Sequence, residues 1–137
     1  MDVFNFKLDP HIVPFVSTKH RYINSLIPAP GTIEILNRLE KIESRSMHGQ
    51  YPIIWDRAED FNVYDIAGNK YIDLTSSIFV ANVGHSNIEV TKAIENTLKK
   101  PLYSCYAYSN LIRAEYIEKL IDFAGKPFEK AFLLSSG

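Results

Sequence analysis

The chain has 137 residues, which is enough for one modest domain. Its 15 basic and 16 acidic side chains give a formal net charge of -1. This balance argues against a nucleic-acid partner and against an electrostatically bound membrane, because both require a basic surface. Hydrophobic residues make up 46% and aromatic residues 12% of the chain, which is typical of a folded core and excludes a disordered polypeptide.

The single cysteine, Cys105, excludes an internal disulfide framework and argues against a zinc site. We interpret Cys105 as a small buried hydrophobe. The N-terminus has neither a basic start nor a long apolar run, so the sequence predicts no signal peptide and no membrane span. These features favour the reducing cytoplasm as the compartment.

The first thirty residues contain four prolines, which interrupt any long helix or strand. We expect an irregular arm that packs on another surface, with a mobile terminus as the alternative. The next stretch, "PGTIEILNRLEKIES", repeats apolar residues at helical spacing and predicts a helix with Thr32 as its N-cap. Core packing is the preferred role of this helix, and partner binding is the alternative.

A hairpin is the clearest local pattern, in "FNVYDIAGNKYIDLT". Two runs rich in Val, Ile and Tyr flank Ala67-Gly68-Asn69, where Gly and Asn tolerate a positive φ. Asp65 and Asp73 are expected to accept turn or capping hydrogen bonds, and this is preferred to catalysis.

"SSIFVANVGH" predicts a partly buried extended stretch through Ile78 and Phe79, followed by a turn at Gly84-His85. His85 invites a catalytic interpretation. A hydrogen-bonded structural role is preferred, because no acid or nucleophile lies nearby in sequence to partner it.

Two helices follow in "SNIEVTKAIENTLKK" and "SNLIRAEYIEKLIDFAGKP". Ser86 and Glu89 match a capping box for the first, and Gly125 is the expected C-terminal cap of the second. The loop between them carries tyrosines at 103, 106 and 108, which suit an interface or pocket rim as well as a core.

The last residues, "KAFLLSSG", predict a buried strand over 130–134 and a tight turn after it. A strand flanked by helices is how a layered α/β sheet begins, and an unpaired strand edge is costly to bury. The strands that would pair with this one are not among these residues. We therefore expect an incomplete α/β domain.

The order of these elements resembles the N-terminal part of a class III aminotransferase, a fold-type I enzyme that uses pyridoxal 5'-phosphate. "PIIWDRAEDFNVYDIAGNKYIDLTSSIFVANVGHSN" is similar to the family's early block, and "LIRAEYIEKLIDFAGKPFEKAFLLSSG" to the helix and strand entering its phosphate-binding turn. The sequence departs from the family at Ala67, often an aspartate, and at Ser76-Ser77, where a glycine is common.

The resemblance implies a division of the chain into an N-terminal arm with part of the small domain, residues 1–85, and the start of the large cofactor-binding domain, residues 86–137. It implies that Ser136 and Gly137 bind the cofactor phosphate, because Gly lets the backbone approach and N–H groups stabilise a dianion. It also implies that Ile78 and Phe79 contact the substrate, although ordinary core positions are an equal alternative.

The activity implied by the resemblance is transfer of an amino group from an amino acid or amine to a 2-oxo acid or aldehyde. The family is homodimeric, and its lysine that binds the cofactor covalently lies downstream of the phosphate turn. No catalytic residue and no metal ligand is therefore assigned here, and these 137 residues are expected to be inactive alone. Alternatives are another fold-type I enzyme, such as an aminomutase or decarboxylase, and a non-catalytic interaction module.

Overall fold

The structure is a computed structural model that describes residues 6–47, 50–100, 102, 105 and 107–135. The chain divides into two compact units, Met1–Ile94 and Glu95–Gly137. The predicted boundary between residues 85 and 86 concerns the domains of the complete fold, and it stays a prediction.

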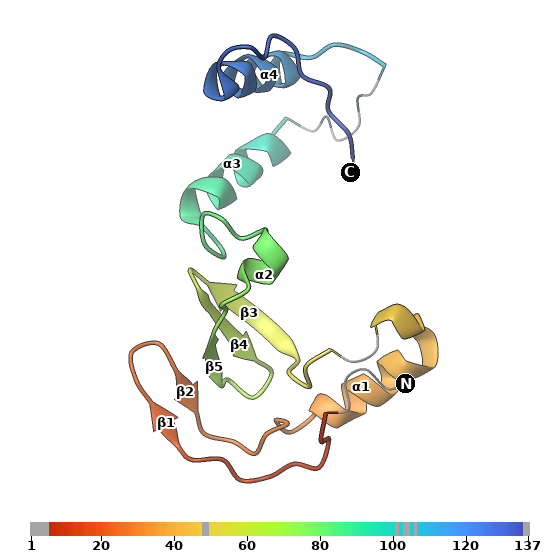
Figure 1. Ribbon diagram of the computed structural model, residues 1–137, viewed down its shortest axis with the longest axis vertical. Helices are drawn as coiled ribbons and strands as arrows, with labels where there is room; N and C mark the ends of the chain where they lie inside the picture. The colour runs from red at the N-terminus through yellow and green to blue at the C-terminus, as the bar shows by residue number, and fades with distance from the viewer. Residues whose placement is uncertain (1–5, 48–49, 101, 103–104, 106, 136–137) are drawn as a thin grey trace. The chain divides into compact units, whose positions relative to one another are not determined.

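An antiparallel sheet with the strand order β1-β2-β5-β4-β3 organises the first unit (Figure 1). Its centre is a meander of β3 (Trp55–Glu59), β4 (Asn62–Asp65) and β5 (Lys70–Ile72). Val63 of β4 is buried and pairs with Ala58 on one side and Tyr71 on the other. The predicted hairpin is confirmed, with β4 and β5 as its two strands.

The hairpin turn is held by the buried Asp65 carboxylate. Asp65 Oδ1 accepts hydrogen bonds from the backbone N–H groups of Ala67 and Asn69, both at 2.9 Å. Oδ2 accepts from Asn69 Nδ2 at 2.8 Å and from the Tyr71 hydroxyl at 2.9 Å. Asp65 is therefore the turn acceptor that the sequence predicts.

The N-terminal arm is more regular than expected, because it adds two short strands to the sheet. They are β1 (Val16–Ser17) and β2 (Tyr22–Ile23), and Tyr22 pairs with Lys70 of β5. Asn69 fixes this junction, since its side chain accepts from the backbone N–H of Asn24 and donates to Ser25 Oγ. The expectation that the arm packs on another surface is thus met by the sheet edge.

Helix α1 (Thr32–Ile42) forms where the apolar spacing predicts it. The predicted N-cap is wrong by one residue: the cap is Gly31, with φ 85°, and no side chain caps the helix. Thr32 is fully buried inside the first turn, and its Oγ1 has no hydrogen-bond partner among the described residues. A short 3₁₀ turn, η1 (Arg45–Met47), follows the helix.

Helix α3 (Ile88–Leu98) begins later than the predicted capping box requires. Its cap is Asn87, whose Oδ1 accepts from the backbone N–H groups of Glu89 and Val90 at 3.0 and 3.2 Å. Ser86 instead donates its hydroxyl to the Ala58 carbonyl at 2.7 Å. The prediction of the helix is confirmed. The prediction of its capping residue is wrong, because the Ser86 hydroxyl is bonded to β3.

Helix α4 (Leu111–Ala124) is the main element of the second unit. Asn110 caps it by accepting from the Arg113 N–H, and Gly125 ends it as the sequence predicts. Cys105 is half-buried, and its Sγ donates to the Tyr108 carbonyl at 3.0 Å. Of the three loop tyrosines, Tyr108 is exposed and Tyr103 and Tyr106 lie outside the described residues.

The predicted strand near the C-terminus is not formed in the described part of the chain. Residues 128–134 carry no strand pairing, and Phe132 and Leu134 are exposed. A strand exists through hydrogen bonds to neighbours, so an apolar segment with no paired partner stays irregular. The apolar pattern predicts a strand, but these residues form no strand without a partner to pair with.

Candidate functional site

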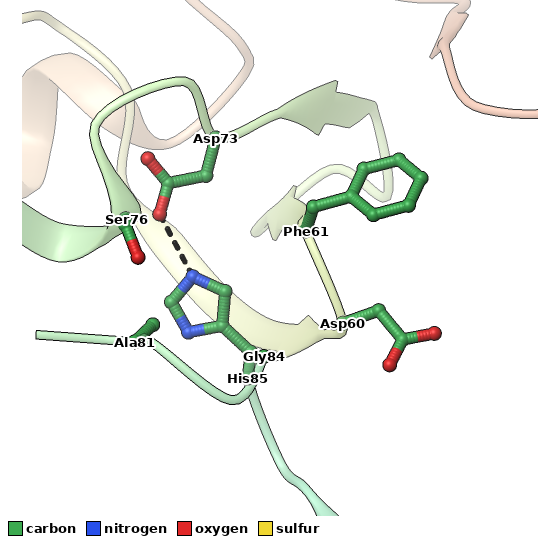
Figure 2. Close-up of a pocket in the computed structure, with 7 residues that line it drawn as sticks. All are labelled: Asp60, Phe61, Asp73, Ser76, Ala81, Gly84 and His85. Carbon is green, nitrogen blue, oxygen red and sulfur yellow. Dashed lines mark hydrogen bonds and ion pairs between the residues drawn. The ribbon is translucent and has the colours of Figure 1, made fainter.

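A cavity of about 310 Å³ lies between the β3–β4 turn, at Asp60 and Phe61, and the loop that follows β5 (Figure 2). Three ionisable side chains line it, Asp60, Asp73 and His85, together with Phe61, Ser76, Ala81 and Gly84. Among the described residues, no group of three or more His, Cys, Asp and Glu side chains is arranged to hold a metal ion.

No helix in the described ranges is long and apolar enough to cross a membrane.

Asp73 and His85 are bonded to each other in the lining of this cavity. His85 Nε2 lies 2.8 Å from Asp73 Oδ2, and the two side chains are 13% and 3% exposed. An ionised carboxylate has no hydrogen to donate, so Nε2 carries the proton in this bond. His85 is therefore the hydrogen-bonded residue that the sequence predicts. Its acidic partner was not apparent from neighbouring positions, because Asp73 lies twelve residues away in the sequence.

Asp73 accepts several more hydrogen bonds from its own loop. Oδ1 accepts from the backbone N–H and the hydroxyl of Thr75, at 2.9 and 2.8 Å, and Oδ2 accepts from the Ser77 N–H at 2.9 Å. Burial by itself raises the pKa of the Asp73 carboxyl, but the bonds from His85, Thr75 and Ser77 outweigh it and lower the pKa from 3.8 to about 2. Asp73 is therefore a carboxylate at neutral pH.

The segment after Asp73 adopts a left-handed turn, α2 (Ser76–Phe79). All four residues have positive φ, from 51° at Ser76 to 67° at Phe79, and none is glycine. Each such residue costs about 1–2 kcal/mol, and a β-branched residue such as Ile78 is an outlier in this region. The predicted extended stretch is thus wrong, and a strained turn stands in its place.

The end of the same loop is pinned to the sheet through the backbone. Asp60 and His85 exchange two backbone hydrogen bonds, Asp60 N–H to the His85 carbonyl at 2.9 Å and His85 N–H to the Asp60 carbonyl at 2.6 Å. Gly84 has φ 86°, and a Cβ there would lie 3.3 Å from Asp60 Cα. Glycine avoids both the strain of this positive φ and the tight contact that a Cβ would make.

The structure brings together Asp73 and His85 but leaves the predicted substrate residues on the surface. Ile78 and Phe79 are 77% and 81% exposed, and they do not line the cavity. The expectation of partial burial is wrong for both, while their role toward a substrate stays a prediction. Ser136 and Gly137, the predicted phosphate ligands, lie outside the described residues.

The cavity itself does not fit a phosphorylated cofactor. Its ionisable groups are two carboxylates and one histidine, and the histidine is already bonded to Asp73. A dianion placed there would meet negative charge, whereas phosphate sites offer N–H groups and cations. The residues that line this cavity therefore do not form a phosphate-binding site.

Comparison with known protein families identifies the class of protein to which this chain belongs. The profile described as aminotransferase class III matches residues 44–137. The chain belongs to the class III aminotransferase family. The resemblance inferred from its sequence is confirmed, and the match begins after the arm and α1.

Curated relatives of known activity give finer comparisons. The chain is 30% identical over 99 residues to acetylornithine aminotransferase of Methanocaldococcus jannaschii, covering 72% of this chain and 24% of that protein. It is 33% identical over 109 residues to the 5-aminovalerate aminotransferase DavT of Pseudomonas aeruginosa, covering 75% and 25%. It is also 36% identical over 73 residues to the 4-aminobutyrate aminotransferase GabT of Escherichia coli, covering 53% and 17%. The chain thus spans about a quarter, or less, of these relatives.

Solved structures agree on the fold. An acetylornithine aminotransferase from Elizabethkingia anophelis superposes with a TM-score of 0.66 at 28% identity, over 72% of this chain and 25% of that one. The ornithine aminotransferase of Plasmodium yoelii superposes equally well, with a TM-score of 0.66, at 21% identity over 72% and 26%. This part of the α/β aminotransferase fold is therefore formed here, as an incomplete domain.

Proposed function

We propose that this chain is part of an aminotransferase that uses pyridoxal 5'-phosphate to move an amino group from an amino acid or amine to a 2-oxo acid or aldehyde. The observation that carries the proposal is the family match over residues 44–137. When bound, the cofactor supplies the electron sink for this exchange. The chain's own contribution is the sheet and the loop after β5.

The substrate class is proposed from the relatives. Acetylornithine, 4-aminobutyrate and 5-aminovalerate are named for three of them. All three carry a primary amine at the end of a carbon chain, so we propose a donor of this kind. A 2-oxo acid is the acceptor that the family resemblance favours.

We further propose the roles that the resemblance assigns to residues. Ser136 and Gly137 bind the cofactor phosphate, and Ile78 and Phe79 contact the donor's carbon chain. The complete protein is a homodimer in the cytoplasm, with residues 1–85 in the arm and small domain and residues 86–137 in the large domain. The single cysteine and the net charge of -1 are consistent with that compartment.

The test uses the protein expressed from the whole coding region that contains these residues. Incubated with pyridoxal 5'-phosphate, 2-oxoglutarate and each terminal-amine donor, it is expected to form glutamate with at least one donor. A protein that forms glutamate with none of them, yet is folded and holds the cofactor, would refute the proposal. Release of carbon dioxide without glutamate would indicate a decarboxylase instead.

The 137 residues alone provide a second test. We expect no single-site covalent adduct after incubation with pyridoxal 5'-phosphate and reduction with borohydride, because none of their lysines lies in the context that the family uses. Peptide mass spectrometry measures this directly. A stoichiometric adduct at one lysine, together with turnover, would contradict the expectation.

A further inference from the structure

The loop from Asp73 to His85 is closed by its own end residues, and it carries the strained turn α2. We propose that Asp73 and His85 are positioning residues, whose bond locks the left-handed turn Ser76–Phe79 so that Ile78 and Phe79 are presented outward for substrate contact. The part of this proposal that concerns substrate contact rests on the proposed function. The hydrogen bonds that Asp73 accepts from Ser77 and His85, called the lock below, stand on the geometry alone.

A single oxygen atom connects the two parts of the lock. Asp73 Oδ2 accepts from the Ser77 N–H inside the left-handed turn and from His85 Nε2 at the far end of the loop. Loss of either donor leaves Oδ2 with the other donor alone, while Oδ1 stays bonded to Thr75. The turn and the loop end are therefore positioned together.

The far end of the loop is fixed in place, because it is hydrogen-bonded to the sheet. The two backbone bonds between Asp60 and His85 fix the histidine to the end of β3, and Ser86 donates to Ala58 of that strand. His85 therefore positions Asp73 relative to the sheet through the bond drawn in Figure 2. Asp73 positions the turn through the bond that it accepts from the Ser77 N–H.

Burial among the described residues does not offset the strain in the turn. Ile78 and Phe79 adopt a costly backbone conformation while their apolar side chains stay exposed. Burial would offset such a cost, but little burial occurs here. Strain that surrounding bonds maintain without a packing benefit is characteristic of functional segments. Glycine would adopt these positive φ angles freely, whereas Ser76 and Ser77 do so at a cost. The hydrogen bonds of Asp73 are therefore needed more here than they would be with glycine.

The test measures hydrogen exchange in the protein expressed from its whole coding region. In Asp73→Asn and His85→Ala, exchange of the Ser77, Phe79 and Val80 amides is expected to accelerate about ten- to a hundredfold, the equivalent of losing one charge-assisted hydrogen bond. His85→Gln keeps an N–H donor near the Nε2 position, and it is expected to retain most of the protection. The β4 amides serve as the internal reference.

Two exposed residues supply matched controls, Asp56→Asn on β3 and His11→Ala in the arm, and neither should change exchange in the turn. No acceleration in Asp73→Asn or His85→Ala would overturn the proposal. So would equal acceleration in β4 (Asn62–Asp65), because the pair would then support the whole sheet.

Glycine at the strained position provides a second variant. Ser77→Gly removes the cost of the positive φ at that residue, so adding it to Asp73→Asn or His85→Ala should restore protection of the Phe79 and Val80 amides, and Ser109→Gly, at a residue without positive φ, should not. Failure of Ser77→Gly to restore it would count against the lock. These readouts need no activity, so a protein that lacks aminotransferase activity but shows them would refute the proposed function and leave the lock standing.

Discussion

Asp73 shows how one residue can organise a loop through hydrogen bonds alone. Its carboxylate accepts four of them, two from Thr75, one from Ser77 and one from His85. Neutralising such a group leaves donors without a full acceptor and removes the charge that strengthens each bond. The lowered pKa of Asp73 reflects the same preference for the charged form.

The first prediction concerns the pH dependence of stability. The pKa of Asp73 is lower in the folded protein, about 2, than the ordinary 3.8, so the unfolded state binds more protons between these values. The stabilisation by Asp73 is therefore complete above about pH 4 and is lost as the pH falls from 3.8 toward 2. The difference in unfolding free energy between wild type and Asp73→Asn, from urea titrations, should shrink over that window.

The exposed Asp56 on β3 supplies the control for this measurement. Asp56→Asn should change the unfolding free energy by less than about 0.5 kcal/mol at any pH, as is usual for surface positions. A wild-type to Asp73→Asn difference that stayed constant down to pH 2 would show that Asp73 does not act through its charge.

The second prediction compares two glycines with similar backbone angles. Gly68 has φ 81°, and a Cβ added there would have no atom within 4 Å, whereas Gly84 has φ 86° and a Cβ there would meet Asp60 Cα. Gly68→Ala should cost about 1–2 kcal/mol from the backbone alone. Gly84→Ala should cost more, since it also pushes apart the two bonds that join Asp60 to His85. Equal costs in thermal or urea unfolding would contradict the close approach.

At the scale of elements, helix starts depend on which polar residue is free to cap. Ser86 and Asn87 are adjacent, and both residue types are good caps. The Ser86 hydroxyl is taken by the Ala58 carbonyl, so Asn87 caps α3. Glu89 contacts Lys92 at 3.6 Å and has no role in a capping box.

The third prediction follows from this cap. Asn87→Ala should lower the unfolding free energy by about 1 kcal/mol, the usual cost of losing an N-cap. Glu89→Ala should cost less, since the exposed ion pair of Glu89 with Lys92 contributes little and its side chain does not close a capping box. Helix content by circular dichroism and urea unfolding distinguish the two. A larger loss in Glu89→Ala than in Asn87→Ala would support the capping box that the sequence suggests.

Elements with a local cause were predictable from the sequence. The α1, α3 and α4 helices follow apolar spacing, and the hairpin follows Gly68 and Asn69 in its turn. The strand at residues 130–134 was not, because a strand depends on neighbours that periodicity cannot supply.

The candidate site was predictable only in part. Asp73 and His85 were each expected to make structural hydrogen bonds, but their contact depends on the path of the loop between them. The left-handed turn at Ser76–Phe79 could not be predicted, because its residue types favour extended or right-handed structure. The hint lay in Ser76-Ser77, at positions where the family resemblance leads one to expect a glycine.

At the scale of the whole molecule, little apolar surface is buried within the described residues. Ile23, Pro28, Ala29 and Val63 are the buried apolar residues there, and all belong to the first unit. The apolar residues Val90, Ile94 and Leu98, spaced four apart along α3, are exposed. A core of this size cannot offset the conformational entropy of a chain of 137 residues.

The fourth prediction is that these 137 residues, prepared alone, self-associate and bind a hydrophobic dye. Large exposed apolar patches drive association, and Phe123 on α4 is 91% exposed. Phe123→Ser should reduce dye binding and shift light scattering toward the monomer, whereas Asp122→Ser, its neighbour on the same helix, should not. The urea dependence of unfolding should also be shallower than is usual for this length, because that slope scales with the surface buried on folding. A monomer with a steep, cooperative transition would mean that these apolar faces are satisfied within the chain, and the idea that they await further structure would have to be abandoned.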